Sequence, residues 1–172
     1  FRSCSTVLRS LPLEGADVTA ALREALRRLA TREDLFHPTM TALAETRAAR
    51  WPEAFHMALV VGGPPPSYLP RPIELHAHDA VRYVSDMLAW VHQAIASERE
   101  LVTSLFAPLA APATTPLVAS ARSVEPPVLD ALIHRMLDRS LAGCCRLLRM
   151  RVQQTLRAEQ QALCLLRLYF VL

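Results

Sequence analysis

Hydrophobic residues recur every three or four positions along much of this chain, most regularly from residue 79 to residue 106. The first apolar stripe there consists of Val81, Val84, Leu88, Val91, Ile95, Val102 and Leu105, with Glu98 as its one polar interruption. A second stripe beside it contains Tyr83, Met87, Trp90, Ala94 and Leu101. This spacing predicts a long α-helix. Its apolar face is wide enough for the interior of a bundle or for a partner protein.

The ends of this helix are also marked in the sequence. Asp79 is a good N-cap, because its carboxylate can accept from the free N–H groups of the first turn. No glycine or proline follows until Pro108, so nothing forces a break before residue 106. Arg82 and Asp86 stand one turn apart and are placed to form an ion pair.

Residues 1–61 are predicted to be a helical segment interrupted by turns. Asp17 is expected to cap a helix, and Thr31 with Asp34 has the form of a capping box for the next one. Pro38 follows too late for a first turn, so we expect a kink or a restart of the helix at that point.

Two connectors separate the remaining segments. Residues 62–78 form a Pro-rich connector, and residues 62–72 of it are expected to be extended, since each proline disfavours helix in the residue before it. Residues 107–126 are rich in Ala, Pro and Thr and also read as a connector. Residues 127–172 are predicted to be C-terminal helices, and Pro126 and Pro127 are expected to open the first of them. Its apolar side includes Leu129, Leu132, Ile133, Met136, Leu137, Leu141, Cys144, Leu148, Val152 and Leu156. We expect one continuous rod segment of a longer subunit.

Composition supports an all-α fold. Hydrophobic residues make up 52% of the 172 positions, only four residues are glycine, and Ala, Leu, Arg and Glu dominate. The predicted architecture is therefore an elongated helical bundle or rod segment with Pro-rich connectors. All nineteen basic residues are arginine, for a net charge of +3. GC-rich codon usage and a demand for planar bidentate pairing would both explain this bias.

The charge pattern argues against nucleic acid as a partner, and the hydropathy pattern argues against a transmembrane helix. Basic blocks interleaved with aromatic residues are absent, so nucleic acid is not expected to bind. No window of about eighteen uninterrupted apolar residues occurs, so no transmembrane helix is expected.

Catalytic motifs are also missing from the sequence. There is no phosphate-binding loop and no nucleophile elbow, and Ser85, Ser97 and Ser140 read as ordinary helix-surface positions. Adjacent Cys144 and Cys145 read as small core residues of a protein in a reducing compartment. We expect no enzyme activity and no cofactor.

One cluster carries metal-ligand chemistry, namely Glu74, His76, His78 and Asp79. The two imidazoles would share a side only on an extended backbone, and no further nitrogen or sulfur ligand is spaced to complete a zinc site. A structural turn that begins the long helix, with Asp79 as its cap, is the preferred interpretation. A small metal-dependent enzyme using His76, His78 and Asp79 is the alternative.

The last predicted helix carries a basic stripe. Five arginines fall within a sector of about 80° if the helix is continuous. They are Arg135, Arg139, Arg146, Arg149 and Arg157. Such a stripe is commonly a solvated face, and the functional alternative is a surface that binds an acidic helix or an anionic membrane.

The central segment resembles the signature segment of subunit six of the conserved oligomeric Golgi complex. The matching residues, in order, are Pro72, Ile73, Glu74, His76, His78, Asp79, Arg82, Tyr83, Val84, Asp86, Met87, Leu88, Ala89, Trp90, His92 and Gln93. Residues 34–38 and 58–64 look like further elements of that family. Residues 145–159 resemble another, although Gln153 stands where the family has an acid and Leu147 where it has a proline.

The resemblance implies a fold and a function. It implies a non-catalytic helical-rod subunit of a vesicle tether that acts in retrograde traffic within the Golgi. Its expected partners are sister subunits and SNARE proteins, and an anionic membrane surface is a further candidate. It also implies peripheral attachment at the cytoplasmic face of the Golgi membrane. The signature residues would then have structural or interaction roles.

Overall fold

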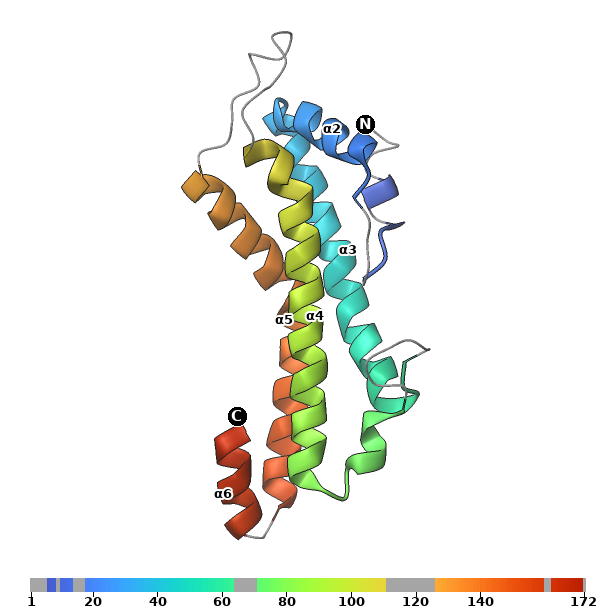
Figure 1. The fold of residues 1–172 in the computed structure, drawn as a ribbon, viewed down its shortest axis with the longest axis vertical. Coiled ribbons are helices and arrows are strands. Elements are labelled where there is room, and N and C mark those ends of the chain that lie inside the picture. The colour runs from blue at the N-terminus through green and yellow to red at the C-terminus, as the bar shows by residue number, and fades with distance from the viewer. Residues whose placement is uncertain are drawn as a thin grey trace. The chain divides into compact units, whose positions relative to one another are not determined.

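A computed structural model describes residues 6–8, 10–13, 18–63, 71–110, 126–159 and 162–171. These residues are mainly helical and include no strand, which confirms the predicted all-α class. The helices are shown in Figure 1 and are α2 (Ala20–Ala30), α3 (Glu33–Val60), the 3-10 helix η1 (Ile73–His76), α4 (Ala80–Ala110), α5 (Pro126–Ala158) and α6 (Ala162–Val171). Asp17, residues 64–70 of the first predicted connector and residues 111–125 of the second lie outside the described residues.

The chain divides into two compact units. The first comprises Phe1–Ala48 with Ile95–Leu141, and the second comprises Ala49–Ala94 with Ala142–Leu172. Helices α3, α4 and α5 each contribute one part to each unit. Each unit therefore combines helical segments that are far apart in sequence.

The first unit has a core built from α2, α3, α4 and α5. Its buried side chains include Leu26 of α2, Met40 and Leu43 of α3, Leu105 of α4 and Met136 of α5. The rings of Phe36 and Phe106 meet edge to face, with centroids 6.4 Å apart. Both residues lie on the apolar faces of their helices, so periodic positions from distant segments meet in one cluster.

A charged pair lies inside this unit. Arg47 of α3 and Glu98 of α4 are 1% and 0% exposed. Arg47 Nε lies 2.8 Å and 2.7 Å from the two carboxylate oxygens of Glu98, and Arg47 Nη2 lies 2.6 Å from Oε2. The guanidinium also donates to the carbonyl oxygens of Pro12 and Leu13, at 3.2 Å and 3.3 Å. Arg47 thus connects α3, α4 and the segment before α2.

The second unit is centred on aromatic side chains. Trp51 and Phe55 of α3 are fully buried. The ring of Trp90 on α4 meets Trp51 edge to face at 6.1 Å and lies tilted against Phe55 at 5.1 Å. Val84, Met87 and Val91 from α4, Cys144 and Val152 from α5, and Leu168 from α6 are also buried in this unit. The apolar stripes predicted on α4 therefore supply core residues.

Several predicted helix ends were wrong. The N-cap of α2 is Thr19, whose side chain accepts from the N–H of Leu22 at 3.3 Å, so Asp17 is not the cap. Thr31 ends α2, and its hydroxyl donates to the carbonyl of Arg28. It therefore does not form a capping box with Asp34, which pairs with Arg32 instead.

Two prolines were expected to interrupt or follow helices, but each lies inside one. Helix α3 continues through Pro38 without a restart, and α4 continues past Pro108 to Ala110. A proline removes one backbone donor and crowds the preceding turn, but neither proline ends its helix here. By contrast, Pro126 and Pro127 open α5 as predicted.

Two predicted side-chain environments were also wrong. Cys145 is exposed, whereas Cys144 is buried and burial raises the pKa of its thiol to about 12. Ser140 is fully buried, and its Oγ has no hydrogen-bond partner among the described residues. Neighbouring residues on a helix point about 100° apart, so only one of two adjacent cysteines can face the core.

Candidate functional site

The segment before α4 is a compact turn, in line with the structural turn preferred for Glu74–Asp79. Pro72 precedes η1, whose short turns are closed by N–H groups of Leu75, Ala77 and Asp79 donating to carbonyl oxygens three residues earlier. Ile73 is only 1% exposed and anchors this turn in the core of the second unit. The turn thus fixes the start of α4.

Asp79 caps α4 as predicted. Its Oδ1 accepts from the N–H of Arg82 at 3.2 Å, and its carbonyl oxygen accepts from the N–H of Tyr83. This satisfies a first-turn N–H group that has no partner within the helix. Arg82 Nε lies 3.9 Å from Asp86 Oδ2, which agrees with the predicted pair.

We expect Asp79→Ala to lower the free energy of unfolding by about 1 kcal/mol, because the first-turn N–H loses its acceptor. Asp79→Asn is the matched control, since its amide oxygen can still cap the helix, and it should change stability much less. Urea titration followed by far-UV circular dichroism measures both. Equal losses in the two variants would show that the carboxylate charge, and not capping, is what matters.

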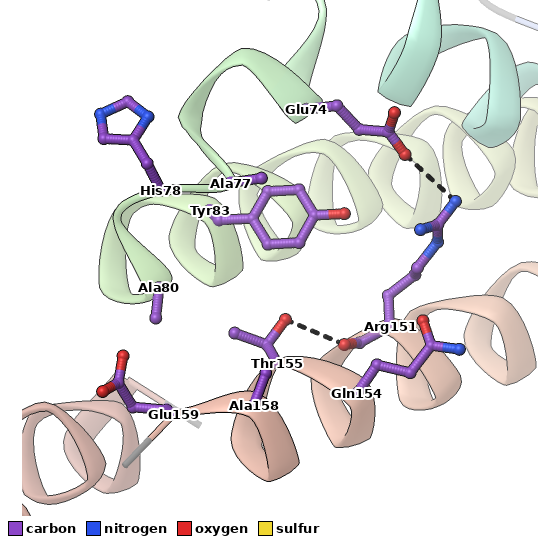
Figure 2. Close-up of a pocket in the computed structure, with 10 residues that line it drawn as sticks. All are labelled: Glu74, Ala77, His78, Ala80, Tyr83, Arg151, Gln154, Thr155, Ala158 and Glu159. Carbon is purple, nitrogen blue, oxygen red and sulfur yellow. Dashed lines mark hydrogen bonds and ion pairs between the residues drawn. The ribbon is translucent and has the colours of Figure 1, made fainter. Parts of the chain in front are cut away.

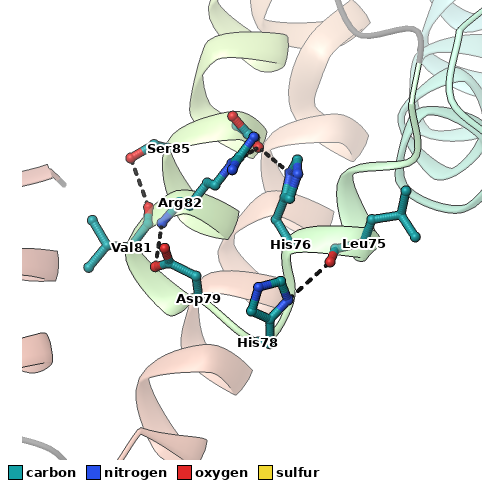
Figure 3. A network of polar contacts seen from close by, with 8 residues as sticks. Leu75, His76, His78, Asp79, Val81, Arg82 and Ser85 are labelled. Atoms are coloured by element: carbon teal, nitrogen blue, oxygen red, sulfur yellow. Dashed lines mark hydrogen bonds and ion pairs between the residues drawn. The ribbon is translucent and has the colours of Figure 1, made fainter.

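The two histidines of the turn have different partners (Figure 3). His76 Nδ1 lies 2.9 Å from Asp86 Oδ2, and both side chains are partly buried. His78 is exposed, and its Nδ1 donates to the carbonyl oxygen of Leu75 at 3.1 Å. Asp79 is engaged by the backbone of α4. Within the described part of the chain, no three His, Cys, Asp or Glu side chains are grouped as metal ligands would be.

A pocket of about 540 Å³ adjoins this turn in the second unit (Figure 2). One wall comes from the turn and the first residues of α4, and the other comes from the last turns of α5. The lining residues are Glu74, Ala77, His78, Ala80, Tyr83, Arg151, Gln154, Thr155, Ala158 and Glu159. Two segments that resemble family elements, residues 72–93 and 145–159, therefore meet at one site.

The pocket is lined by both small apolar and polar side chains. Glu74 Oε1 and Arg151 Nη2 form an ion pair at 3.1 Å across it. The Tyr83 hydroxyl points toward this pair (Figure 2), and burial is the main cause that raises its pKa, against the nearby Arg151 charge. Tyr83 therefore stays neutral at physiological pH. A half-exposed pair of this kind contributes about 0–1 kcal/mol.

Most of the signature residues have structural positions. Ile73, Tyr83 and Met87 are buried, Trp90 and Leu88 are half-buried, and Asp79, Glu74, Arg82 and Asp86 form caps or pairs. Pro72 borders η1. His78 and His92 are exposed, as are Asp79 and Arg82.

All five arginines of the predicted basic stripe are exposed. In the first unit, Arg139 pairs with Glu45 at 2.6 Å, and Arg135 Nε donates to the carbonyl oxygen of Ala131 on its own helix. In the second unit, Arg146, Arg149 and Arg157 make no ion pair with a described residue. The stripe thus splits into an internally engaged part and a free part.

An exposed apolar patch at the end of α3 was not predicted from the sequence. Met57, Val60 and Val61 are 48%, 46% and 57% exposed. At about 100° per residue these positions share one side of the helix. Gly62, at a φ of 85°, ends this helix, and its N–H donates to the carbonyl oxygen of Met57. The signal was present in the sequence as a run of aliphatic residues extending beyond one helix face.

A family model for "Conserved Oligomeric Golgi complex subunit 6, C-terminal" matches residues 1–172. The chain belongs to this subunit 6 family. The match covers the signature turn, α4 and the end of α5, which meet at the pocket of the second unit. It confirms the resemblance of the chain to that family.

Curated proteins named conserved oligomeric Golgi complex subunit 6 agree with this assignment. The Cryptococcus neoformans protein is 35% identical over 92% of this chain, and the Rattus norvegicus protein is 34% identical over 98%. The Arabidopsis thaliana protein is 38% identical over 85%. The chain spans 21%, 23% and 21% of the lengths of these three subunit 6 proteins. No solved structure gives a significant match.

A search of the described helices for a membrane span found none with both the length and the apolarity required.

Proposed function

We propose that this chain is a non-enzymatic segment of a subunit of a multisubunit Golgi tethering complex, and that it acts by binding sister subunits. The observation that carries the proposal is the subunit 6 family match along residues 1–172. Curated relatives over most of this chain are themselves named as subunits of the conserved oligomeric Golgi complex.

The structure offers a surface suited to this role. The patch of Met57, Val60 and Val61 is apolar, exposed and held on the last turns of a long helix. Exposed apolar groups of this kind favour contact with another protein, because burying them removes apolar surface from water. We therefore assign this patch as a candidate contact with a sister subunit.

The finer parts of the proposal follow from the family. They are capture of vesicles in retrograde traffic within the Golgi, contact with SNARE proteins, and peripheral attachment at the cytoplasmic face of the Golgi membrane. They predict no catalytic turnover and no cofactor. The high pKa of the Cys144 thiol agrees with the absence of a nucleophilic role for that residue, since the thiolate is the reactive form.

The alternative, a metal-dependent enzyme at His76, His78 and Asp79, has weaker support. Each of these side chains is directed to a different partner, namely Asp86, the Leu75 carbonyl and the Arg82 N–H. A shared metal would have to replace these contacts. Stoichiometric zinc retained by the purified protein after chelation would favour the enzyme.

We expect the double substitution Val60→Asp and Val61→Asp to reduce recovery of sister subunits by more than tenfold, since buried apolar anchors contribute about 1–2 kcal/mol or more each to an interface. The measurement is quantitative co-purification with the tagged intact subunit from cells. His56→Asp, an exposed change on the same helix, is the control. Full recovery of sister subunits with the double variant would remove this patch from the interface, whereas no recovery even with the unchanged chain would overturn the proposed function.

A further inference from the structure

The net charge of the chain lies in one unit. The first unit contains eleven arginines and eleven acidic residues, whereas the second contains eight arginines and five acidic residues. The excess of +3 therefore belongs to the second unit. Three of its acidic residues are used locally, because Glu74 pairs with Arg151, Asp79 caps α4, and Asp86 contacts His76.

The arginine excess is concentrated on the second half of α5. No acidic residue occurs from position 142 to position 158. Arg146, Arg149 and Arg157, together with Met150, fall within a sector of about 100° on this helix. All four are exposed, and Met150 is 47% exposed. This face thus presents cations and an apolar side chain to solvent.

Helix α6 presents its apolar side outward in the same unit. Leu168 is fully buried, whereas Leu166, Tyr169 and Phe170 are 55%, 77% and 79% exposed. At about 100° per residue these three lie together, opposite Leu168. The rings of Tyr169 and Phe170 contact each other edge to face at 5.7 Å. The one charged residue of this helix, Arg167, is also exposed.

We propose that the second half of α5 and helix α6 form a binding surface for an anionic lipid membrane. Arginines near an anionic bilayer each add to binding, and exposed aromatic side chains insert at the headgroup level. The combination of arginines without an ion-pair partner among the described residues and exposed aromatic side chains favours an anionic membrane, because guanidinium groups pair with lipid phosphates and aromatic rings lie at the headgroup level.

This inference refines the basic stripe and rests on one part of the proposed function, namely peripheral attachment to the Golgi membrane. The two can fail separately, because vesicles contain no sister subunit. Arg135 and Arg139 of the first unit are omitted, since Arg139 pairs with Glu45 and the first unit has no excess charge. The proposed membrane-binding surface also includes Arg167 and the exposed apolar side chains of α6.

The test is co-sedimentation of the whole chain with vesicles of phosphatidylcholine alone or mixed with phosphatidylserine. The chain should bind only the anionic vesicles, and added salt should weaken binding. Substituting Arg146, Arg149 and Arg157 with Gln should reduce the partition coefficient by roughly 100-fold, at about fivefold for each arginine. Tyr169→Ser with Phe170→Ser should also reduce it while leaving the salt dependence intact.

The matched control replaces three exposed arginines of the first unit, Arg23, Arg99 and Arg135, with Gln. It removes the same charge and should retain most of the binding. Equal losses in the two triple variants would mean that net charge alone acts, which would overturn the proposal. Capture of an acidic helical peptide, with no binding to anionic vesicles, would also overturn it in favour of a protein partner.

Discussion

Arg47→Leu should destabilise the first unit by about 3–5 kcal/mol, because it leaves the carboxylate of Glu98 buried without its cation. The carbonyl oxygens of Pro12 and Leu13 would also lose their donors. Glu98→Leu should have a similar effect through the unpaired guanidinium. Urea unfolding followed by far-UV circular dichroism measures the loss as a shift of the transition to lower denaturant.

The double variant Arg47→Leu with Glu98→Leu distinguishes pairing from packing. Replacing both members of a buried pair by apolar residues is often neutral or stabilising, so the double variant should recover most of the stability lost in either single variant. Arg28→Gln breaks the exposed pair with Glu24 and should change stability by less than about 0.5 kcal/mol. If Arg47→Leu and Glu98→Leu each lowered the free energy of unfolding no more than Arg28→Gln does, the buried pair would not have the role described.

Trp51→Ala should destabilise the second unit by about 3–5 kcal/mol, since it removes a fully buried large side chain and leaves a cavity. Trp51 is 0% exposed and meets Trp90 edge to face. The same denaturation measurement applies. Trp51→Phe keeps a ring at the site and should cost less, because the cavity is smaller.

Met57→Ala is the control on the same helix. Met57 is 48% exposed, so its truncation should change stability by about 0.5 kcal/mol or less. A loss for Trp51→Ala no greater than that for Met57→Ala would mean that this part of α3 is not packed as described.

Local features of the sequence predicted the helices well. Asp79 as a cap, the apolar stripes of α4 and the opening of α5 at Pro126 are all set by residues within a few positions of each other. Such features depend on helix geometry and on end effects, which act over one or two turns. Helix ends were less reliable, because Thr31 can serve the end of one helix or the start of the next.

Features that depend on distant residues were harder to predict. Arg47 and Glu98 are separated by 51 residues. Glu98 interrupts an apolar stripe of α4, and Arg47 lies one turn from the buried Leu43 and one turn from the buried Trp51 on α3. A basic residue among the apolar positions of α3 and an acidic residue among those of α4 were the signal in the sequence for a buried ion pair. Ser140 had a similar signal, since Met136 and Cys144 lie one turn to either side and are buried.

The candidate site was predicted in part. The sequence located the signature segment, but the pocket forms only where residues 74–83 meet residues 151–159. The exposed apolar residues of α3 and α6 could not be assigned from periodicity, because a stripe shows which side chains share a face and not which face is covered. Burial in the fold decides that.

Both tryptophans of the chain belong to the aromatic cluster of the second unit. Indole emission therefore reports on that unit alone, whereas ellipticity averages over all the helices. Recording both signals in one melt, without any added label, tells whether the two units unfold together. If emission changes after the ellipticity has begun to fall, the first unit has unfolded first.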